Sequence, residues 1–213
     1  MLNQSQIKLI ATILMVIDHA GLLFELEPMR IIGRLSFPLF SWIFAQNWKR
    51  RGEDTAKPLI DRLIIFGIIA QFPYILFNGA NFRLNILFSF ALVAILFNQI
   101  HQEKNHKILT LIIGLIGSEI LNIDYGWYAI ICTLLMLNYK ANDKKWWIGW
   151  IVLNIAYSLS CSSFIQLFAI FTPIILLSHD STKNQKPAMF EKKFFYCFYP
   201  VHLAVLAALR TIL

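Results

Sequence analysis

The sequence predicts an all-α protein, a polytopic bundle of about nine transmembrane helices with its N-terminus in the cytoplasm. Composition gives the first reason: 58% of the 213 residues are hydrophobic and 15% are charged. The mean hydropathy of +0.61 is far above that of a soluble domain. The second reason is a succession of apolar runs with short polar breaks. The third is that basic residues favour alternate breaks.

Nine apolar runs follow one another along the chain, and the longest approach the roughly 20 residues that a helix needs to cross a bilayer. They cover residues 7–24, 29–48, 59–77, 84–101, 108–121, 126–139, 146–160, 163–178 and 194–212. The fifth to seventh are short for a full crossing, so eight spans is the alternative count. No repeat or soluble domain interrupts the runs, and we expect one domain over residues 1–213.

The positions of the basic residues indicate how this bundle is oriented in the membrane. With nine spans and the N-terminus inside, 15 of the 19 Lys and Arg residues fall in cytoplasmic segments, as they do in membrane proteins generally. The exceptions are Arg30, Arg34, Arg83 and Arg210. The net charge of +7 is therefore a topological signal, and the expected surroundings are lipids with no nucleic-acid partner.

The stretch MVIDHAGLLF places two ionisable residues, Asp18 and His19, inside the first apolar run. Such a group costs about 2.5–3.5 kcal/mol in a membrane span, so each needs a partner or a wet cavity. Neighbouring positions on a helix point about 100° apart, so we expect these partners on other helices. Arg34, in RIIGRLSFPLF, lies at a matching depth. An Asp18–Arg34 ion pair and direct contact of Arg34 with a ligand both remain open.

Further polar residues gather at the outer ends of the fourth to sixth runs. The segment RLNILFSF contributes Arg83 and Asn85, and SEILNIDYGWY contributes Glu119, Asp124 and Tyr125. We expect these five to contact substrate. The alternatives are that the Asp124 segment simply forms a turn and that Arg83 reaches out to the headgroups.

The last run opens with FFYCFYPVHL, in which Tyr196, Tyr199 and His202 are spaced three apart and share a helix face. Pro200 cannot donate to the carbonyl four residues before it. His202 is either a core histidine bonded to a backbone carbonyl or part of a polar cavity lined by the two tyrosines. The cysteines lack metal-ligand spacing, and no HExxH, GxSxG, Walker or GxGxxG motif occurs. No metal is therefore expected.

In order and spacing, the segments IKLIATILMVIDHAG, RIIGRLSFPLF, DYG and FYCFYPVHL resemble the TraX family. The resemblance covers nearly the whole chain. It implies a multi-pass inner-membrane enzyme that transfers an acetyl group from acetyl-CoA to the N-terminal amine of a pilin subunit. The matching positions are Asp18, His19, Gly33, Arg34, Phe37, Pro38, Asp124, Tyr125, Gly126, Tyr199, Pro200 and His202.

Each candidate residue suits a step of this chemistry. Histidine accepts protons near pH 7, so His19 is the expected general base. Arg34, His202 or Tyr199 would donate to the oxygen that gains charge as the amine attacks, and Asp18 would hold Arg34. Basic residues on the cytoplasmic side would bind the phosphates of CoA. The residues expected in this role are Arg50, Arg51, Lys192 and Lys193.

Two alternatives stay open. One is an acyltransferase of the same class that acts on a cell-surface sugar or a lipid headgroup. The other is a non-catalytic membrane protein of pilus assembly or transport, in which Asp18, His19 and Glu119 form a proton relay. No inverted repeat supports the transporter alternative.

Overall fold

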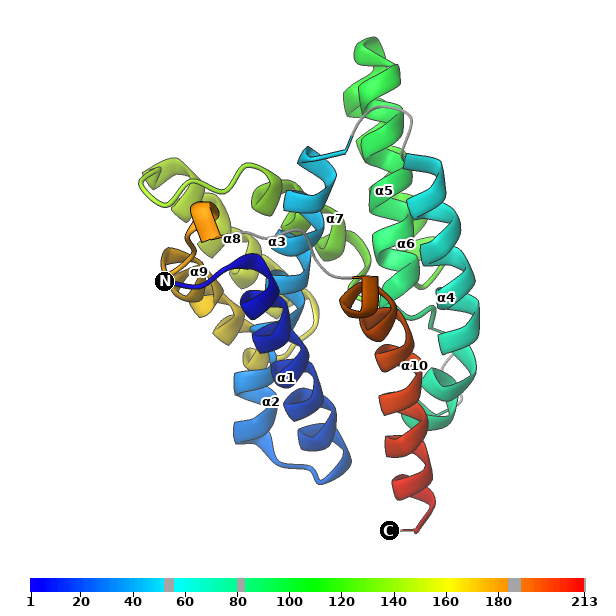
Figure 1. The fold of residues 1–213 in the computed structure, drawn as a ribbon. Coiled ribbons are helices and arrows are strands. Elements are labelled where there is room, and N and C mark those ends of the chain that lie inside the picture. The colour runs from blue at the N-terminus through cyan, green and yellow to red at the C-terminus, as the bar shows by residue number, and fades with distance from the viewer. Residues whose placement is uncertain (52–55, 80–82, 184–188, 213) are drawn as a thin grey trace. The chain divides into compact units, whose positions relative to one another are not determined.

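The computed structural model describes residues 1–51, 56–79, 83–183 and 189–212, and every regular element within them is helical (Figure 1). Two isolated bridges, Leu2 with His179 and Leu84 with Ile123, are the strand-like pairings in this part of the chain. The prediction of an all-α protein is confirmed. The chain divides into two compact units, so the expected single domain stays a prediction.

The first unit comprises Met1–Lys49 and Cys132–Glu191. Its helices are α1 (Gln4–Leu23), α2 (Glu27–Gly33), α3 (Ser36–Lys49), the second half of α7 (Gly126–Leu137), α8 (Lys144–Ser160), η3 (Phe164–Phe171), α9 (Thr172–Leu177) and η4 (Ser181–Lys183). Helix α1 packs on α2 and α3, and α8 packs on η3. Figure 1 shows α1 and α2 as a helical hairpin in blue.

The second unit comprises Arg50–Ile131 and Lys192–Leu213. Its helices are α4 (Ala56–Asn78), α5 (Ile86–Gln102), η2 (Lys104–His106), α6 (Lys107–Ile120), the first half of α7 and most of α10 (Met189–Ile212). Helix α5 packs on both α4 and α6. These three helices form the cyan-to-green group in Figure 1.

Short polar side chains cap the N-terminal ends of several of these helices. Asn3 forms a capping box at α1: its side chain accepts a bond from the Gln6 N–H (2.8 Å), and the Gln6 side chain accepts one from the Asn3 N–H (2.9 Å). Asp143 caps α8 by accepting from the Lys145 N–H at 2.9 Å. Such bonds satisfy N–H groups that have no partner within the helix, which fixes where the apolar helix begins.

The helices coincide with the nine predicted apolar runs, although two runs are divided. The second run forms α2 and α3, which are separated at Arg34 and Leu35. Pro38 explains this break, because it lacks the N–H that would bond the Arg34 carbonyl. The eighth run forms η3 followed by α9. The break matters for the site, because it places Arg34 at the C-terminal end of a short helix.

Within the described residues, α1 and α4 are long and apolar enough to cross a membrane, and several other apolar helices are shorter. The predicted count of about nine spans is therefore not confirmed. Apolar side chains are nevertheless exposed in stripes at helical spacing. On α6 the stripe consists of Ile108, Ile112, Ile116 and Ile120, and on α10 it consists of Val201, Val205 and Leu209. Stripes of this kind suit helices that face lipid.

Candidate functional site

Asp18 of α1 holds two arginines of the following segment. Arg34 Nε donates to Asp18 Oδ1 at 3.1 Å, and Arg34 Nη2 bonds to Oδ2. Arg30 Nε lies 3.2 Å from Oδ1. The Asp18 and Arg34 side chains are each only 13% exposed. The Asp18–Arg34 ion pair, one of the two alternatives that the sequence left open, is present, and Arg30 is a second partner that sequence reasoning missed. We call Asp18, Arg30 and Arg34 the arginine–aspartate cluster.

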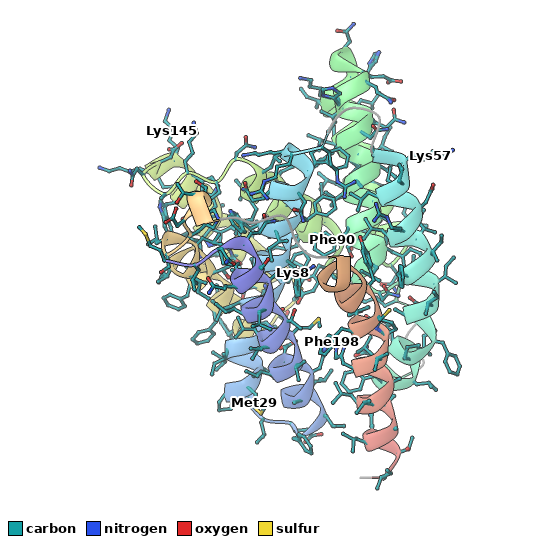
Figure 2. The ribbon with its side chains drawn as sticks, in the orientation of Figure 1. Lys8, Met29, Lys57, Phe90, Lys145 and Phe198 are labelled. Atoms are coloured by element: carbon teal, nitrogen blue, oxygen red, sulfur yellow. The ribbon has the colours of Figure 1, made fainter. Side chains whose placement is uncertain are left out.

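Two glycines bring the helices close enough for these bonds. A Cβ added at Gly33 would lie 2.3 Å from the Cβ of Asp18 and 2.6 Å from its Cα. A Cβ added at Gly21 would lie 2.8 Å from that of Met29, which is labelled in Figure 2. The α1–α2 hairpin therefore packs backbone against backbone on both sides of the cluster. The missing side chain at Gly33 permits this close approach of α2 to α1.

Replacing Gly33 by alanine is expected to lower the free energy of unfolding by about 1–3 kcal/mol, because the new methyl group must push α1 and α2 apart. Gly117→Ala is the matched control, since no atom lies within 4 Å of a Cβ placed there. In an exposed helix that change should be neutral or stabilising. Thermal unfolding in detergent measures both variants. Equal melting temperatures would contradict the close packing at Gly33.

The arginine–aspartate cluster has more positive than negative charge, since two guanidinium groups face one carboxylate. His19 follows Asp18 on α1 and is partly exposed. The cluster therefore places positive charge one residue away from an imidazole. Such an arrangement can stabilise an oxygen that becomes negative while the imidazole accepts a proton.

In the second unit, a tight turn sets the position of Asp124. The Leu84 N–H donates to the Asn122 carbonyl at 3.0 Å, and the Asp124 N–H donates to the Leu84 carbonyl at 2.8 Å. The Ser89 hydroxyl donates to the Asp124 carbonyl at 2.6 Å. Arg83 Nη1 lies 3.8 Å from Asp124 Oδ1, in a loose ion pair with the arginine side chain 54% exposed. The turn, which the sequence offered as the alternative for Asp124, is present, and contact of Asp124 with substrate stays a prediction.

The side chains of Glu119 and Asn85 each accept a hydrogen bond from a backbone N–H in the first turn of a helix. Glu119 Oε1 accepts a bond from the Trp127 N–H at 3.0 Å in the first turn of α7, where a carboxylate is favoured by the helix dipole. Asn85 is fully buried. Its side chain caps α5 through the Leu87 N–H (3.0 Å) and donates to the Gly67 carbonyl of α4 (2.8 Å). Both residues thus have structural roles, and their contact with substrate stays a prediction.

Tyr199 and His202 are buried on the same face of α10. His202 Nδ1 lies 3.1 Å from the Phe198 carbonyl oxygen. Because a carbonyl can only accept, Nδ1 carries the proton and the ring's lone pair is on Nε2. The imidazole stacks on Phe198, labelled in Figure 2, with ring centroids 5.3 Å apart, and the Tyr199 ring lies 5.5 Å away. The carbonyl bond expected of a core histidine is present, together with a tyrosine neighbour.

Of the basic residues expected to bind CoA, Arg51 has the most distinctive surroundings. Burial lowers the pKa of its guanidinium below the usual value, the nearby Tyr196 opposes this, and the charge of Arg62 adds to it. Arg62 is exposed and donates to the Pro58 carbonyl at 2.9 Å. Sequence reasoning missed Arg62, although it lies only eleven residues beyond Arg51. Arg50 is exposed.

The structure says less about the remaining candidate residues. Lys192 and Lys193 lie outside the residues whose side chains are described. Asp18, His19 and Arg34 belong to the first unit, and the other described candidates belong to the second. That these residues act together in one site stays a prediction. Among the described residues, no group of three or more His, Cys, Asp or Glu side chains could hold a metal ion.

These features define an all-helical protein with apolar outer faces and ionisable groups set among its helices, which is the class of membrane-associated helical proteins. The family model described as "TraX protein" matches residues 3–210, so the chain belongs to the TraX family.

Relatives cover most of the chain. Protein TraX of Escherichia coli is 31% identical over 95% of this chain and 85% of that protein. The probable fimbrial assembly protein FimC, serogroup H1, of Dichelobacter nodosus is 30% identical over 98% of this chain and 96% of its own. A second Protein TraX, from Escherichia coli strain K12, is 27% identical over 95% of this chain and 85% of its own. No solved structure matches.

Proposed function

We propose that this protein transfers an acetyl group from acetyl-CoA to the N-terminal amine of a pilin subunit, as a multi-pass protein of the inner membrane. Membership of the TraX family supports an association with pilus proteins, and one relative is named as a fimbrial assembly protein. The exposed apolar stripes of α6 and α10 support the membrane setting.

The arrangement at His19 is the observation that carries the proposal. His19 directly follows Asp18 in α1, and the Asp18 carboxylate holds two guanidinium groups. Acetyl-CoA supplies the acetyl group as a thioester. The acceptor nitrogen forms a bond to the carbonyl carbon as the bond to sulfur breaks, and the amine proton passes to His19. Arg34 stabilises the carbonyl oxygen while it carries negative charge, and Asp18 positions Arg34.

The basic residues proposed to face the cytoplasm fit the donor. The positively charged Arg51 is partly buried within electrostatic reach of the like charge on Arg62. Like charges in a partly desolvated place are unfavourable, and a phosphate between them would relieve the repulsion through charge-assisted bonds. Arg50 and Arg51, joined by Arg62, are therefore proposed to bind the CoA phosphates, with Lys192 and Lys193 in the same role.

Changing both Arg51 and Arg62 to glutamine should raise the KM for acetyl-CoA about tenfold, because charge-assisted bonds to phosphate are lost. The turnover number and the KM for a pilin peptide should stay nearly constant. Steady-state kinetics in detergent measure these constants. Lys145→Gln, which removes an exposed charge at the start of α8 (labelled in Figure 2), is the control. An unchanged KM for acetyl-CoA in the double variant would contradict this donor site.

A proton relay through Asp18, His19 and Glu119 has less support. Asp18 is engaged by two arginines, and Glu119 accepts a backbone bond at the start of α7. Both carboxylates therefore have structural partners among the helices, and these contacts give a proton relay no support of its own. An acyltransferase acting on a sugar or lipid headgroup would use the same chemistry at His19 and differs in the acceptor.

Purified protein tests the reaction and the acceptor together. It is mixed with acetyl-CoA and a synthetic pilin peptide that has a free N-terminal amine, and release of free CoA and the mass of the peptide are recorded. We expect thiol release matched by one added acetyl group at the N-terminus. Thiol release dependent on added sugar or lipid in place of peptide would favour the other acceptor. No thiol release with any of the three would contradict an acyltransferase.

A further inference from the structure

Three lysines gather at the start of α8 in the first unit. Lys140 lies in the loop before the helix, and Lys144 and Lys145 are its first two residues. All three are exposed, and Figure 2 shows Lys145 directed away from the ribbon. The Asp143 N–H donates to the Lys140 carbonyl at 3.2 Å, and this turn keeps Lys140 close to the helix end. We call Lys140, Lys144 and Lys145 the lysine cluster.

The positive charge of the lysine cluster is not balanced by the protein. In the part of the chain that the structure describes, no ion pair or hydrogen bond involves these ammonium groups. Asp143 caps α8 by accepting from the Lys145 N–H at 2.9 Å and the Trp146 N–H at 3.4 Å, and the first turn holds no acidic residue. A helix N-terminus carries partial positive charge, so cations there are unfavourable. An anion at this position would relieve the repulsion.

An exposed apolar stripe continues from the lysine cluster along α8. Its residues follow one another at intervals of three or four and therefore share one helix face: Ile148, Val152, Ile155 and Leu159. Lys144 lies four residues before Ile148, on the same face. The buried residues of α8 lie on the opposite side of the helix. The same face of α8 thus offers an ammonium group at its start and apolar surface along its length.

Two tryptophans hold this end of α8 in place. Trp146 Nε1 donates to the Leu135 carbonyl of α7 at 2.7 Å, and Trp147 Nε1 donates to the Ala141 carbonyl of the loop at 2.9 Å. The Trp147 side chain is partly exposed. Tryptophan is enriched where lipid headgroups meet acyl chains, because its ring is apolar and its N–H is polar. This places the lysine cluster at the depth of the headgroups.

The lysine cluster lies at the same end of the first unit as the N-terminus. At the far end of α8 the Ser158 hydroxyl donates to the Ser163 carbonyl at 2.7 Å, and the chain then runs back along α8 as η3 and α9. After α9, the Leu2 N–H donates to the Ser178 carbonyl at 2.6 Å. Since the N-terminus is predicted to be cytoplasmic, the cluster faces the cytoplasmic leaflet, whose anionic lipids attract basic segments.

We infer that the lysine cluster and the apolar stripe of α8 bind an anionic phospholipid of the cytoplasmic leaflet. Its phosphate pairs with the ammonium groups, and its acyl chains lie along the stripe. A soluble phosphate would balance the charge but leave the stripe uncovered, so the combination selects a lipid. This assignment rests on the membrane setting of the proposed function and is independent of acetyl transfer.

Photolabelling of the full chain in nanodiscs tests the surface. The nanodiscs consist of zwitterionic phospholipid with a small fraction of a probe that has a photoreactive group in the acyl chain near the glycerol. One probe is a phosphatidylglycerol, and the other is a phosphatidylcholine with the same chains. Peptide mass mapping locates the labelled residues. We expect residues 138–152 to be labelled about fivefold more by the anionic probe. Equal labelling of this segment by the two probes would overturn the inference.

A triple variant with Lys140→Gln, Lys144→Gln and Lys145→Gln should bring the labelling ratio of residues 138–152 close to one. Its thermal unfolding should be unchanged, because it removes exposed charges that have no partner among the described residues. The control carries Lys57→Gln and Lys107→Gln, which remove exposed lysines at the starts of α4 and α6. It should keep the full ratio. A ratio that survives the triple variant, or that falls as far in the control, would contradict this site.

Competition distinguishes a lipid from a soluble anion. Saturating inorganic phosphate or acetyl-CoA should leave the labelling ratio of residues 138–152 unchanged at constant ionic strength. Loss of the ratio with either competitor would show that the lysine cluster binds a soluble phosphate and would overturn the lipid assignment.

The two proposals can fail separately. Anionic-lipid labelling that depends on the lysine cluster, without acetyl transfer to peptide, would leave the lipid site standing and contradict the enzyme. Acetyl transfer together with equal labelling by the two probes would support the enzyme and overturn the lipid site.

Discussion

Replacing His19 by alanine is expected to lower the rate of acetyl transfer roughly 100- to 10,000-fold, the range attributed to general acid–base catalysis. The reason is local. His19 follows Asp18 of the arginine–aspartate cluster in α1, and its removal takes away the proposed proton acceptor without leaving a buried charge. The rate is measured with purified protein, acetyl-CoA and free-amine peptide, and helicity by circular dichroism confirms that the variant is folded.

A control variant at a second histidine tests whether the loss of rate is specific to His19 or follows from the loss of any imidazole. His106 is exposed at the start of α6 in the second unit, so His106→Ala should keep the full rate. A folded His19→Ala protein that still acetylates peptide at the original rate would remove His19 as the base. His202 would then be the remaining candidate near the tyrosines, since its lone pair is on Nε2.

Asp18→Asn is expected to lower the free energy of unfolding by about 3 kcal/mol, because it leaves two guanidinium groups without their carboxylate. Arg34→Met should cost less, since Asp18 keeps Arg30 as a partner. The double variant should be more stable than Asp18→Asn, because only one guanidinium is then left without its carboxylate. Unfolding in denaturant, monitored in the same detergent, gives the three values.

Comparison of the stability lost in the double variant with the sum of the two single losses shows whether Asp18 and Arg34 interact. If the loss in the double variant equals the sum of the two single losses, Asp18 and Arg34 do not stabilise one another, and the arginine–aspartate cluster is not the structural unit described above. A triple variant that also carries Arg30→Met should recover further stability, since no guanidinium of the cluster then lacks its carboxylate.

Much of the helical arrangement is predictable from local patterns. The apolar runs locate the helices. In an apolar segment the backbone N–H and C=O groups must hydrogen-bond one another, and a helix allows this within the segment itself. Pro38 predicts the break after α2 for a steric reason. The number of membrane crossings is harder to predict from the sequence. A helix such as α7, with 12 residues, is shorter than a bilayer core, and length alone does not decide whether it crosses.

The candidate site is predictable only in part. The sequence offers an Asp18–Arg34 pair as one of two alternatives, because an ionisable group in an apolar run requires a partner at similar depth. Arg30 was missed, although it precedes Arg34 by four residues and so shares its helix face.

The most direct test of acetyl transfer is the intact mass of the pilin made in cells that contain this protein, in cells that lack it, and in cells with the His19→Ala variant. The proposed function predicts that pilin from the first cells is heavier by one acetyl group, located at its N-terminal residue, and that pilin from the other two is unmodified. Identical pilin masses in all three cell types would contradict it.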